Sequence, residues 1–275
     1  MYVLYSESHF LNERQSRSPF SRHSMPKRPF IRKPKRRRHG QSFWEHEYAA
    51  GGHLKLSDEP GEDLVKFTRW HARQKQTTAF TPSQTALDLG CGNGRHLFFL
   101  YEQFGLTGIG YDTAEPALKQ ARERAKAFAK HATPPPLTFA RRSIAEPLPL
   151  PDSSVNLALD MMTSHFLAAA ERTALRDEIY RVLAPGGWLF MKTFLQDGDL
   201  HTKRLLAEHP ADDPGSYIHP VIGVAEHAYT EAELRDFLGE RFVVHKVYRS
   251  HQHKRQGQAR KRRTISIYAE KDPYA

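Results

Sequence analysis

The 275-residue sequence contains a single cysteine, which excludes a disulfide within the chain and a zinc site built from several cysteines. No uninterrupted apolar run reaches the roughly 18 residues that a membrane-spanning helix requires. The N-terminal stretch carries Glu7, His9 and Glu13 where a secretion signal would have its apolar segment. We therefore expect a soluble, cytoplasmic protein that does not contact a membrane.

Acidic residues are almost missing from two stretches of the chain. Residues 1–40 hold eleven Lys and Arg against two acids, and residues 246–263 hold eight Lys and Arg and no acid, within a net charge of +10. Residues 16–40 also mix Arg, Ser and Pro without helical or strand periodicity, and they offer little apolar area to offset the entropy of ordering. The sequence predicts a disordered basic arm over 1–40 and a folded domain over 41–275.

Strand-like and helix-like segments alternate through the folded part. This alternation predicts an α/β fold, in which a mostly parallel sheet is covered by helices on both faces. The two closing strands have no helix between them, so we expect the last strand to be antiparallel. A loop-rich insertion is expected at about 195–228, and a basic hairpin segment at 246–263. The seven expected strands are 85–89, 107–111, 137–141, 155–159, 188–194, 242–248 and 264–269.

The expected helices surround these strands. The apolar spacing favours helices over 62–74, 95–104 and 167–183, and a further helix that Thr113 could cap. Thr230 and Glu233 form a capping box that opens a helix to about residue 238. Pro185-Gly186-Gly187 is expected to be a turn before the fifth strand.

The stretch ALDLGCGNGR at 86–95 is the most informative part of the sequence. An apolar strand runs into three glycines at alternate positions, and a helix follows at once. Glycines there permit a tight turn and the close approach of a ligand to the main chain. A dinucleotide fingerprint would need Gly or Ala at position 95, which is Arg95, and the Gly-Lys-Ser/Thr of a phosphate-binding loop is also missing.

Two acids accompany the glycine turn. Asp112 ends the next strand, about 20 residues beyond the glycines. A carboxylate at that position can accept hydrogen bonds from both hydroxyls of a ribose. Asp88 lies two residues before Gly90, where it would repel a pyrophosphate but suits a ligand with an ammonium group and a sulfonium.

Several sequence motifs of this chain resemble those of a known protein family. LDLGCGNG at 87–94 with GIGYD at 108–112 closely resembles the first motifs of class I S-adenosylmethionine (AdoMet)-dependent methyltransferases. LPLPDSSVNLALD at 148–160, EIYRVLAPGGWLFMKTF at 178–194 and YTEAELRDFL at 229–238 resemble later family segments in the family's order. The resemblance covers roughly 60–271, and it implies a Rossmann-like sheet of seven strands, methyl transfer and AdoMet as cofactor.

The resemblance also implies a set of cofactor-binding residues. The glycine loop would surround the methionine part, Asp112 would hold the ribose, and neighbouring side chains would flank the adenosine. Many members carry an Asp-Ala pair that touches the adenine, whereas this chain has Ile144 and Ala145. Either Ser143 or backbone groups replace the missing carboxylate, or the adenine is held more loosely. The implied cofactor-binding residues are Asp88, Gly90, Cys91, Gly92, Gly94, Tyr111, Asp112, Thr113, Ser143, Ile144, Ala145 and Asp160.

The segment DMMTSH at 160–165 matches the part of the family that faces the sulfonium and the incoming nucleophile. In-line transfer from an activated sulfonium needs chiefly alignment and desolvation, and it needs a base where the nucleophile carries a proton of high pKa. Asp160 and His165 are the candidate catalytic residues. The plainer alternatives are that Asp160 positions the cofactor and that His165 caps or packs.

The acceptor is left open by the sequence. The histidines and acids of 195–228 lack the spacing of a known metal motif, so we expect no metal site. That insertion and residues 42–70 are expected to cover the acceptor pocket, with Trp44, Tyr48, His53, Tyr217 and His219 as lining residues.

The basic stretches leave three readings open. One is a methyltransferase, expected to be a monomer, whose segments 16–40 and 246–263 attract RNA or another polyanion without sequence preference. The second is a small-molecule methyltransferase with unrelated basic tails. The third is a non-catalytic protein that binds AdoMet or RNA.

Overall fold

The computed structural model describes residues 39–50, 57–75, 79–129, 135–251, 254–255, 258–259 and 262–274. The arm expected over 1–40 lies outside the described residues, except for its last two, which open helix α1 (His39–Ala50). All described residues belong to one compact unit, residues 37–275. None of the helices in the described ranges is long and apolar enough to span a membrane.

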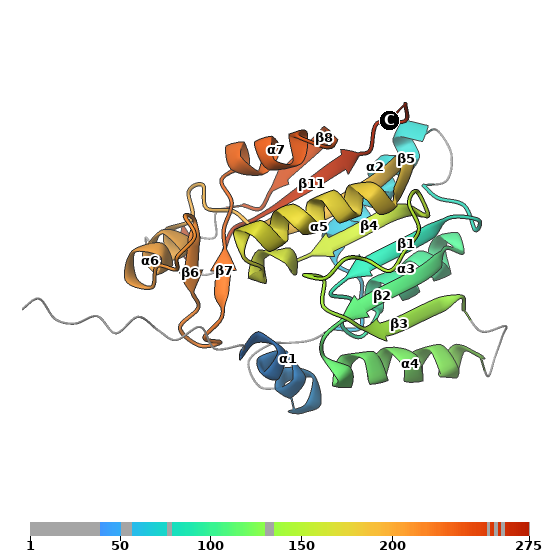
Figure 1. Ribbon diagram of the computed structural model, residues 1–275, viewed down its shortest axis with the longest axis horizontal. Coiled ribbons are helices and arrows are strands. Elements are labelled where there is room, and N and C mark those ends of the chain that lie inside the picture. Colours follow the sequence, from blue (N-terminus) through green and yellow to red (C-terminus); the bar gives the residue numbers. More distant parts are fainter. Residues whose placement is uncertain are drawn as a thin grey trace, which may run out of the picture. The chain divides into compact units, whose positions relative to one another are not determined.

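A seven-stranded sheet forms the centre of this unit (Figure 1). The strand order is β3-β2-β1-β4-β5-β11-β8, and β11 runs antiparallel to both of its neighbours, whereas the first five strands are parallel. The expected α/β class and antiparallel last strand are thus confirmed. The bounds are β1 Thr85–Leu89, β2 Thr107–Asp112, β3 Leu137–Arg141, β4 Val155–Met161, β5 Leu183–Phe194, β8 Val243–Arg249 and β11 Thr264–Glu270.

Two apolar cores lie on opposite faces of the sheet. Side chains alternate along each strand, so on β4 Ala158 joins one core, while Leu157 and Leu159 join the other. Buried side chains of α5 (Ala169–Val182) and α7 (Glu231–Gly239) complete the first core, and both helices lie on one face in Figure 1. The second core is completed by α2 (Glu62–Lys75), α3 (Arg95–Phe104) and α4 (Glu115–Ala129).

Strand β5 is longer than the sequence indicates. Pro185-Gly186-Gly187, expected to be a turn, lies inside the strand, where the register against β4 shifts between the pairs Val155–Leu183 and Leu157–Trp188. Gly186 has a φ of +72°, and Lys271 holds both glycines through hydrogen bonds between the backbones. The Pro-Gly-Gly segment therefore forms a bulge inside β5, because the backbone of Lys271, just after β11, pairs with both glycines.

The insertion is more regular than the loop-rich segment expected over 195–228. It contains α6 (Leu200–Glu208) and a two-stranded antiparallel sheet of β6 (Ser216–Ile218) and β7 (Ala225–His227). The side chain of Asp199 caps α6 by accepting from the backbone N–H of His201 at 3.0 Å. Within the basic segment, β9 (Lys254–Arg255) pairs antiparallel with β10 (Gln258–Ala259).

The strand order reverses at the centre of the sheet, because the chain proceeds outward from β1 through β2 and β3 and then returns to β4. In such sheets, a ligand crevice opens at the carboxyl ends of the strands on either side of the reversal. The glycine turn follows β1 at this edge, and the segment with the short 3₁₀ helix η1 (Ser164–Phe166) follows β4.

Candidate functional site

The glycine turn occupies the reversal point in a conformation that other residues resist. Gly90, Gly92 and Gly94 have φ values of +76°, +54° and +78°, the left-handed region that a side chain disfavours. The backbone N–H groups of Gly90 and Cys91 both donate to the carbonyl of Tyr111 on β2, at 2.8 and 3.0 Å. The turn is therefore fixed against the neighbouring strand, and α3 begins immediately after it.

Asp112 joins the ends of the two strands. Its Oδ2 accepts from the N–H of Gly92 and its Oδ1 from the N–H of Ala114, both at 2.8 Å. Burial of the carboxyl group raises its pKa, while backbone hydrogen bonds from Ala114, Gly92 and Thr113 oppose the shift. A carboxylate has about four lone-pair sites, so the group can still accept a further hydrogen bond.

Two side chains lie over the glycines where a Cβ would otherwise project. A Cβ on Gly90 would lie 2.3 Å from Cγ2 of Thr163, and one on Gly92 would lie 2.2 Å from the hydroxyl of Tyr48. Burial and the nearby Asp112 carboxylate raise the pKa of Tyr48. Tyr48 was expected to line the acceptor pocket, but its hydroxyl lies directly on the turn.

Tyr48 belongs to α1, which several contacts hold across this edge of the sheet. Nη2 of Arg141, the last residue of β3, donates to Glu45 at 2.6 Å, and Nε2 of Gln120 on α4 donates to the carbonyl of Tyr48 at 3.0 Å. On the other side, the Trp44 ring meets Phe166 of η1 edge to face at 5.7 Å. Helix α1 therefore bridges the crevice from α4 and β3 to η1.

Asp88 lies beneath the turn and is almost completely buried. Nδ1 of His96, on α3, approaches its Oδ2 at 3.4 Å, and neither carboxylate oxygen has a hydrogen-bond partner among the described residues. His96 is not predicted from the sequence as a site residue, although it directly follows Arg95. A buried carboxylate without a hydrogen-bonded partner leaves acceptor capacity unused at this point.

Asp160, the second-to-last residue of β4, lies beside Leu89 of β1, and its carboxylate is hydrogen-bonded to the segment that follows. Its Oδ1 accepts from the backbone N–H of Ser164 at 3.0 Å. Burial raises the pKa of Asp160, and the hydrogen bonds from Ser164 oppose that shift. Between these residues, Met162 has a φ of +65°, an uncommon conformation for a residue with a side chain, and such backbone strain is frequent at functional sites.

His165 is completely enclosed rather than exposed to the crevice. Burial and, next, the guanidinium of Arg262 lower its pKa to about 3. Its Nδ1 has no hydrogen-bond partner in the described part of the chain, and its ring meets that of Phe194 at 4.9 Å. At neutral pH the imidazole is thus uncharged and a weak base.

The remaining candidates lie on the walls of the same edge. Cys91 is buried, and this burial raises the pKa of its thiol well above the usual value, so the thiol stays protonated. Ser143 Oγ accepts from the N–H of Ala145 at 3.2 Å, and the carbonyl of Thr113 accepts from Arg141. The Ile144 side chain packs in the apolar core with that of Tyr111.

The expected acceptor-pocket residues do not form one group. Tyr217 is fully buried and donates to Glu226, so it does not line an open pocket as expected. His219 is partly exposed, and it accepts weakly from the backbone N–H of Val221 at 3.3 Å. His53 lies outside the described residues. No set of three His, Cys, Asp or Glu in the described ranges is arranged to hold a metal ion.

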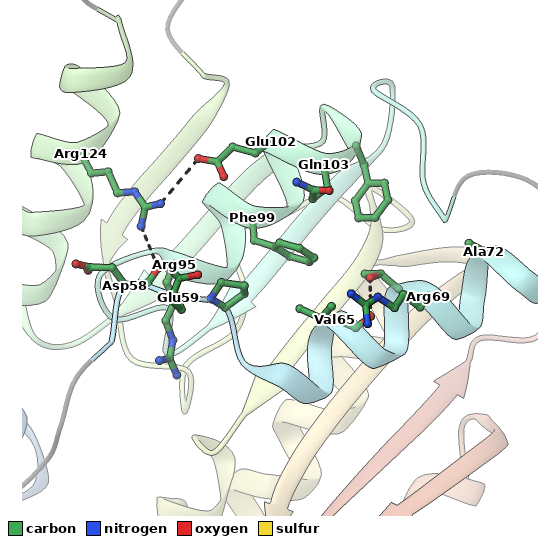
Figure 2. A pocket seen from close by; sticks show the side chains of 13 residues that line it. Asp58, Glu59, Val65, Arg69, Ala72, Arg95, Phe99, Glu102, Gln103 and Arg124 are labelled. Atoms are coloured by element: carbon green, nitrogen blue, oxygen red, sulfur yellow. Dashed lines mark hydrogen bonds and ion pairs between the residues drawn. The ribbon is translucent and has the colours of Figure 1, made fainter.

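A cavity of about 530 Å³ opens elsewhere, along the groove between α2 and α3 (Figure 2). Phe99, Val65 and Ala72 form its apolar part, and the ion pair between Arg124 and Glu102 lies at one end. It is a surface groove on the α2–α3 face, and of the residues around the glycine turn it includes Arg95, the first residue of α3.

The comparisons with known proteins converge on one family. Residues 86–187 match the family described as "Methyltransferase domain". An uncharacterised methyltransferase of Synechocystis is 29% identical over 119 residues, which are 43% of this chain and 51% of the relative. An arsenite methyltransferase of Halobacterium salinarum is 33% identical over 125 residues, which are 44% of this chain and 30% of the relative. The chain thus spans about half or less of these curated relatives.

A solved structure extends the match over more of the chain. The SAM-dependent methyltransferase of Methanosarcina mazei superposes with a TM-score of 0.58 at 26% identity, and it covers 70% of this chain and 94% of its own. The matched region includes the glycine turn, Asp112 and Asp160. Over residues 86–187 the chain thus carries a methyltransferase domain, and its fold is that of the AdoMet-dependent methyltransferases, whose cofactor is AdoMet.

Proposed function

We propose that this chain transfers the sulfonium methyl group of AdoMet to an acceptor held at the carboxyl edge of the parallel sheet. One observation carries the proposal. The left-handed glycine turn and the Asp112 carboxylate lie side by side at the strand reversal, within the region that matches the methyltransferase domain. Ligands of such sheets bind at this position.

The residues at the turn fit AdoMet. We assign the ribose hydroxyls to Asp112, whose carboxylate can still accept a further hydrogen bond, and the methionine part to the backbone of Gly90 to Gly94. The Asp88 carboxylate, which accepts no hydrogen bond from the described residues, suits the ammonium group of that part. When bound, AdoMet supplies a methyl group on a positively charged sulfur. The Tyr48 hydroxyl lies against Gly92, so Tyr48 and α1 would form the outer wall of the site.

Asp160 and His165 receive different proposed roles. The Ser164 N–H holds the Asp160 carboxylate at the end of β4, where it would orient the cofactor or accept a proton from the acceptor. His165, with a pKa of about 3, is too weak a base to remove a proton of high pKa. We therefore propose that His165 shapes the acceptor side of the site without itself exchanging a proton.

The acceptor is proposed from chemistry alone. The Halobacterium relative acts on arsenite by its name, but arsenite is thiophilic, and the single cysteine of this chain is buried and protonated. RNA or another polyanion as acceptor rests on the basic stretches. Within 246–263, Arg249 pairs with Glu231, Arg262 pairs with Glu226, and Arg263 donates to backbone carbonyls. A polyanion would therefore have to use residues 16–40 and the remaining cations of the hairpin.

Calorimetry with AdoMet and S-adenosylhomocysteine tests the proposal. Asp112→Ala should weaken cofactor binding at least tenfold, about 1.4 kcal/mol, because it removes the carboxylate assigned to the ribose. Asp112→Asn keeps the shape and one acceptor oxygen, so it should retain the fold if Asp112→Ala does not. Asp236→Ala, at an exposed acid on α7, is the matched control and should bind like the wild type. Unchanged affinity in both Asp112 variants would overturn the cofactor assignment.

A further inference from the structure

A buried polar cluster joins the insertion to the segment before β11. Tyr217 on β6 and Glu226 on β7 contribute to it from the insertion, and Arg262 contributes from the residues just before β11. The Tyr217 hydroxyl and Nη1 of Arg262 both donate to the same oxygen of Glu226, at 2.5 and 2.6 Å. Tyr217 and Glu226 are almost entirely buried, and the Arg262 side chain is 13% exposed. The cluster thus holds an ion pair at the border of the folded core.

One edge of the Arg262 guanidinium is left unused. Its Nε and Nη2 atoms are buried, and neither has a hydrogen-bond partner among the described residues. These two N–H groups point the same way from a planar group, and their spacing matches the two oxygens of a carboxylate. Leaving such donors buried and unpaired is unfavourable, so this edge is suited to bind a ligand.

Other engaged arginines of the same protein show what a purely structural role looks like. Arg181 donates from all three guanidinium nitrogens, to Glu178, Asp152 and two backbone carbonyls. Arg263, the neighbour of Arg262 in the chain, also uses all three, toward the carbonyls of Ser250 and Asp197. Among the residues that the structure describes, Arg262 forms hydrogen bonds through one nitrogen, and its Nε and Nη2 atoms have none.

The Arg262 guanidinium and the segment that follows β4 contact the same aromatic ring. The guanidinium carbon of Arg262 is 3.1 Å above the centre of the Phe194 ring, at the carboxyl end of β5, and His165 packs edge to face against that same ring. His165 in turn has an unpartnered, buried Nδ1. The unused donors and the acceptor side of the proposed methyl-transfer site therefore share one aromatic ring.

The charges around His165 favour an anion. The neighbours that lower the pKa of His165 are Arg262, His227 and Arg172, and all of them are basic groups. Glu226 already offsets one unit of positive charge, so a monoanion suits the site better than a phosphate with two charges. The partly exposed ring of Phe194 suits an apolar or aromatic body attached to that anion.

We propose that the Nε–Nη2 edge of Arg262 binds the carboxylate of a small acidic methyl acceptor, with Phe194 as the ring on which the acceptor's anionic end is aligned. The identification of the bound acid as a methyl acceptor rests on the proposed methyltransferase function. The binding site itself stands on the geometry of Arg262, Glu226 and Phe194.

Three pairs of small molecules test the site: acetate, benzoate and phenylacetate, each beside its own amide. Binding is measured by NMR with and without S-adenosylhomocysteine. At least one acid should bind the wild-type protein ten times more tightly than its amide, and it should shift an arginine Nε–H signal that is missing from Arg262→Lys. Arg262→Lys should lose this preference, because an ammonium group retains the charge toward Glu226 but lacks the paired N–H edge.

Arg249→Lys is the control, since Arg249 pairs with Glu231 away from the cluster, and it should keep the preference. Acids that bind no better than amides, or an equal preference in Arg262→Lys, would overturn the inference. If Arg262→Lys does not fold, the wild-type acid-to-amide ratio and the Nε–H shift still decide it. Failure of S-adenosylhomocysteine to bind any form would refute the proposed function separately.

Discussion

The site leaves no room for a side chain at Gly92. This glycine has a φ of +54°, and a methyl group there would meet the Tyr48 hydroxyl. Gly92→Ala should therefore lower the free energy of unfolding by about 1–2 kcal/mol from backbone strain and weaken binding of S-adenosylhomocysteine. Urea unfolding and calorimetry measure the two effects.

The steric part of this effect can be separated from the strain. Tyr48→Phe removes the hydroxyl that the added methyl group would touch, so the double variant should recover part of the loss. The strain at φ +54° should persist in both backgrounds. Strictly additive effects of the two substitutions on unfolding would show that Tyr48 does not lie on the turn.

His165 should make stability depend on pH in a defined direction. Its pKa is about 3 in the folded protein, against 6.5 for an ordinary histidine, so protonation favours the unfolded chain. Its contribution is fully present above pH 6.5 and is lost as the pH falls toward 3, at up to about 1.4 kcal/mol per pH unit. His165→Gln should flatten the stability profile between about pH 6.5 and 4 relative to the wild type. Parallel profiles for the two proteins would contradict the burial of a neutral imidazole.

At the scale of elements, a tryptophan on α1 can report cofactor binding through its fluorescence. The protein has three tryptophans: Trp44 lies on α1, while Trp70 and Trp188 are buried in the second core. Because α1 lies against the glycine turn through Tyr48, S-adenosylhomocysteine should change the fluorescence of Trp44 and leave the core tryptophans unaffected. Trp44→Phe should abolish the change without loss of binding by calorimetry. A change that persists in that variant would place the response in the core instead.

The sequence predicts elements well where one local pattern controls them. The strand and glycine turn at 85–94 and the capping box at Thr230 and Glu233 appear as expected, because apolar periodicity and capping act over a few residues. The Pro185-Gly186-Gly187 turn became a bulge, because its partner Lys271 lies far along the chain.

The same distinction between local patterns and contacts of distant residues applies to the site. Asp112 and the glycine turn are predicted from their spacing, and the structure places them together at the strand reversal. The contact of Tyr48 with Gly92, and the convergence of Tyr217, Glu226 and Arg262, join distant segments and leave no local periodicity. The one available hint was Arg262 itself, which looked like a member of a solvated basic run and is instead paired inside the fold.

At the scale of the whole molecule, the basic arm is where polyanion binding should be tested. Deleting residues 1–38 removes eleven cationic side chains. If the arm binds RNA, the plot of log affinity against log salt should flatten by about 0.7–0.9 for each phosphate that the truncated protein no longer neutralises. S-adenosylhomocysteine affinity should not change, since the cofactor residues all lie beyond Arg37.

The internally paired cations provide a control for this experiment. Arg249→Gln removes a cation that Glu231 already neutralises, so the salt dependence should stay that of the full-length protein. Full-length and truncated proteins that bind a generic RNA equally, with equal slopes, would leave the arm without a part in RNA binding.

Strand β11 comes last along the chain but lies inside the sheet. It separates β5 from β8, and its Ile265 and Ile267 are fully buried. A chain that stops at residue 251 would leave β5 as an open apolar edge, the kind of surface that pairs with other molecules and aggregates. The same geometry makes the protein divisible: a peptide of residues 262–274 is the missing inner strand, and its addition should reconstitute the fold from two pieces. Sheet closure would then become a binding event, set by the concentration of the peptide.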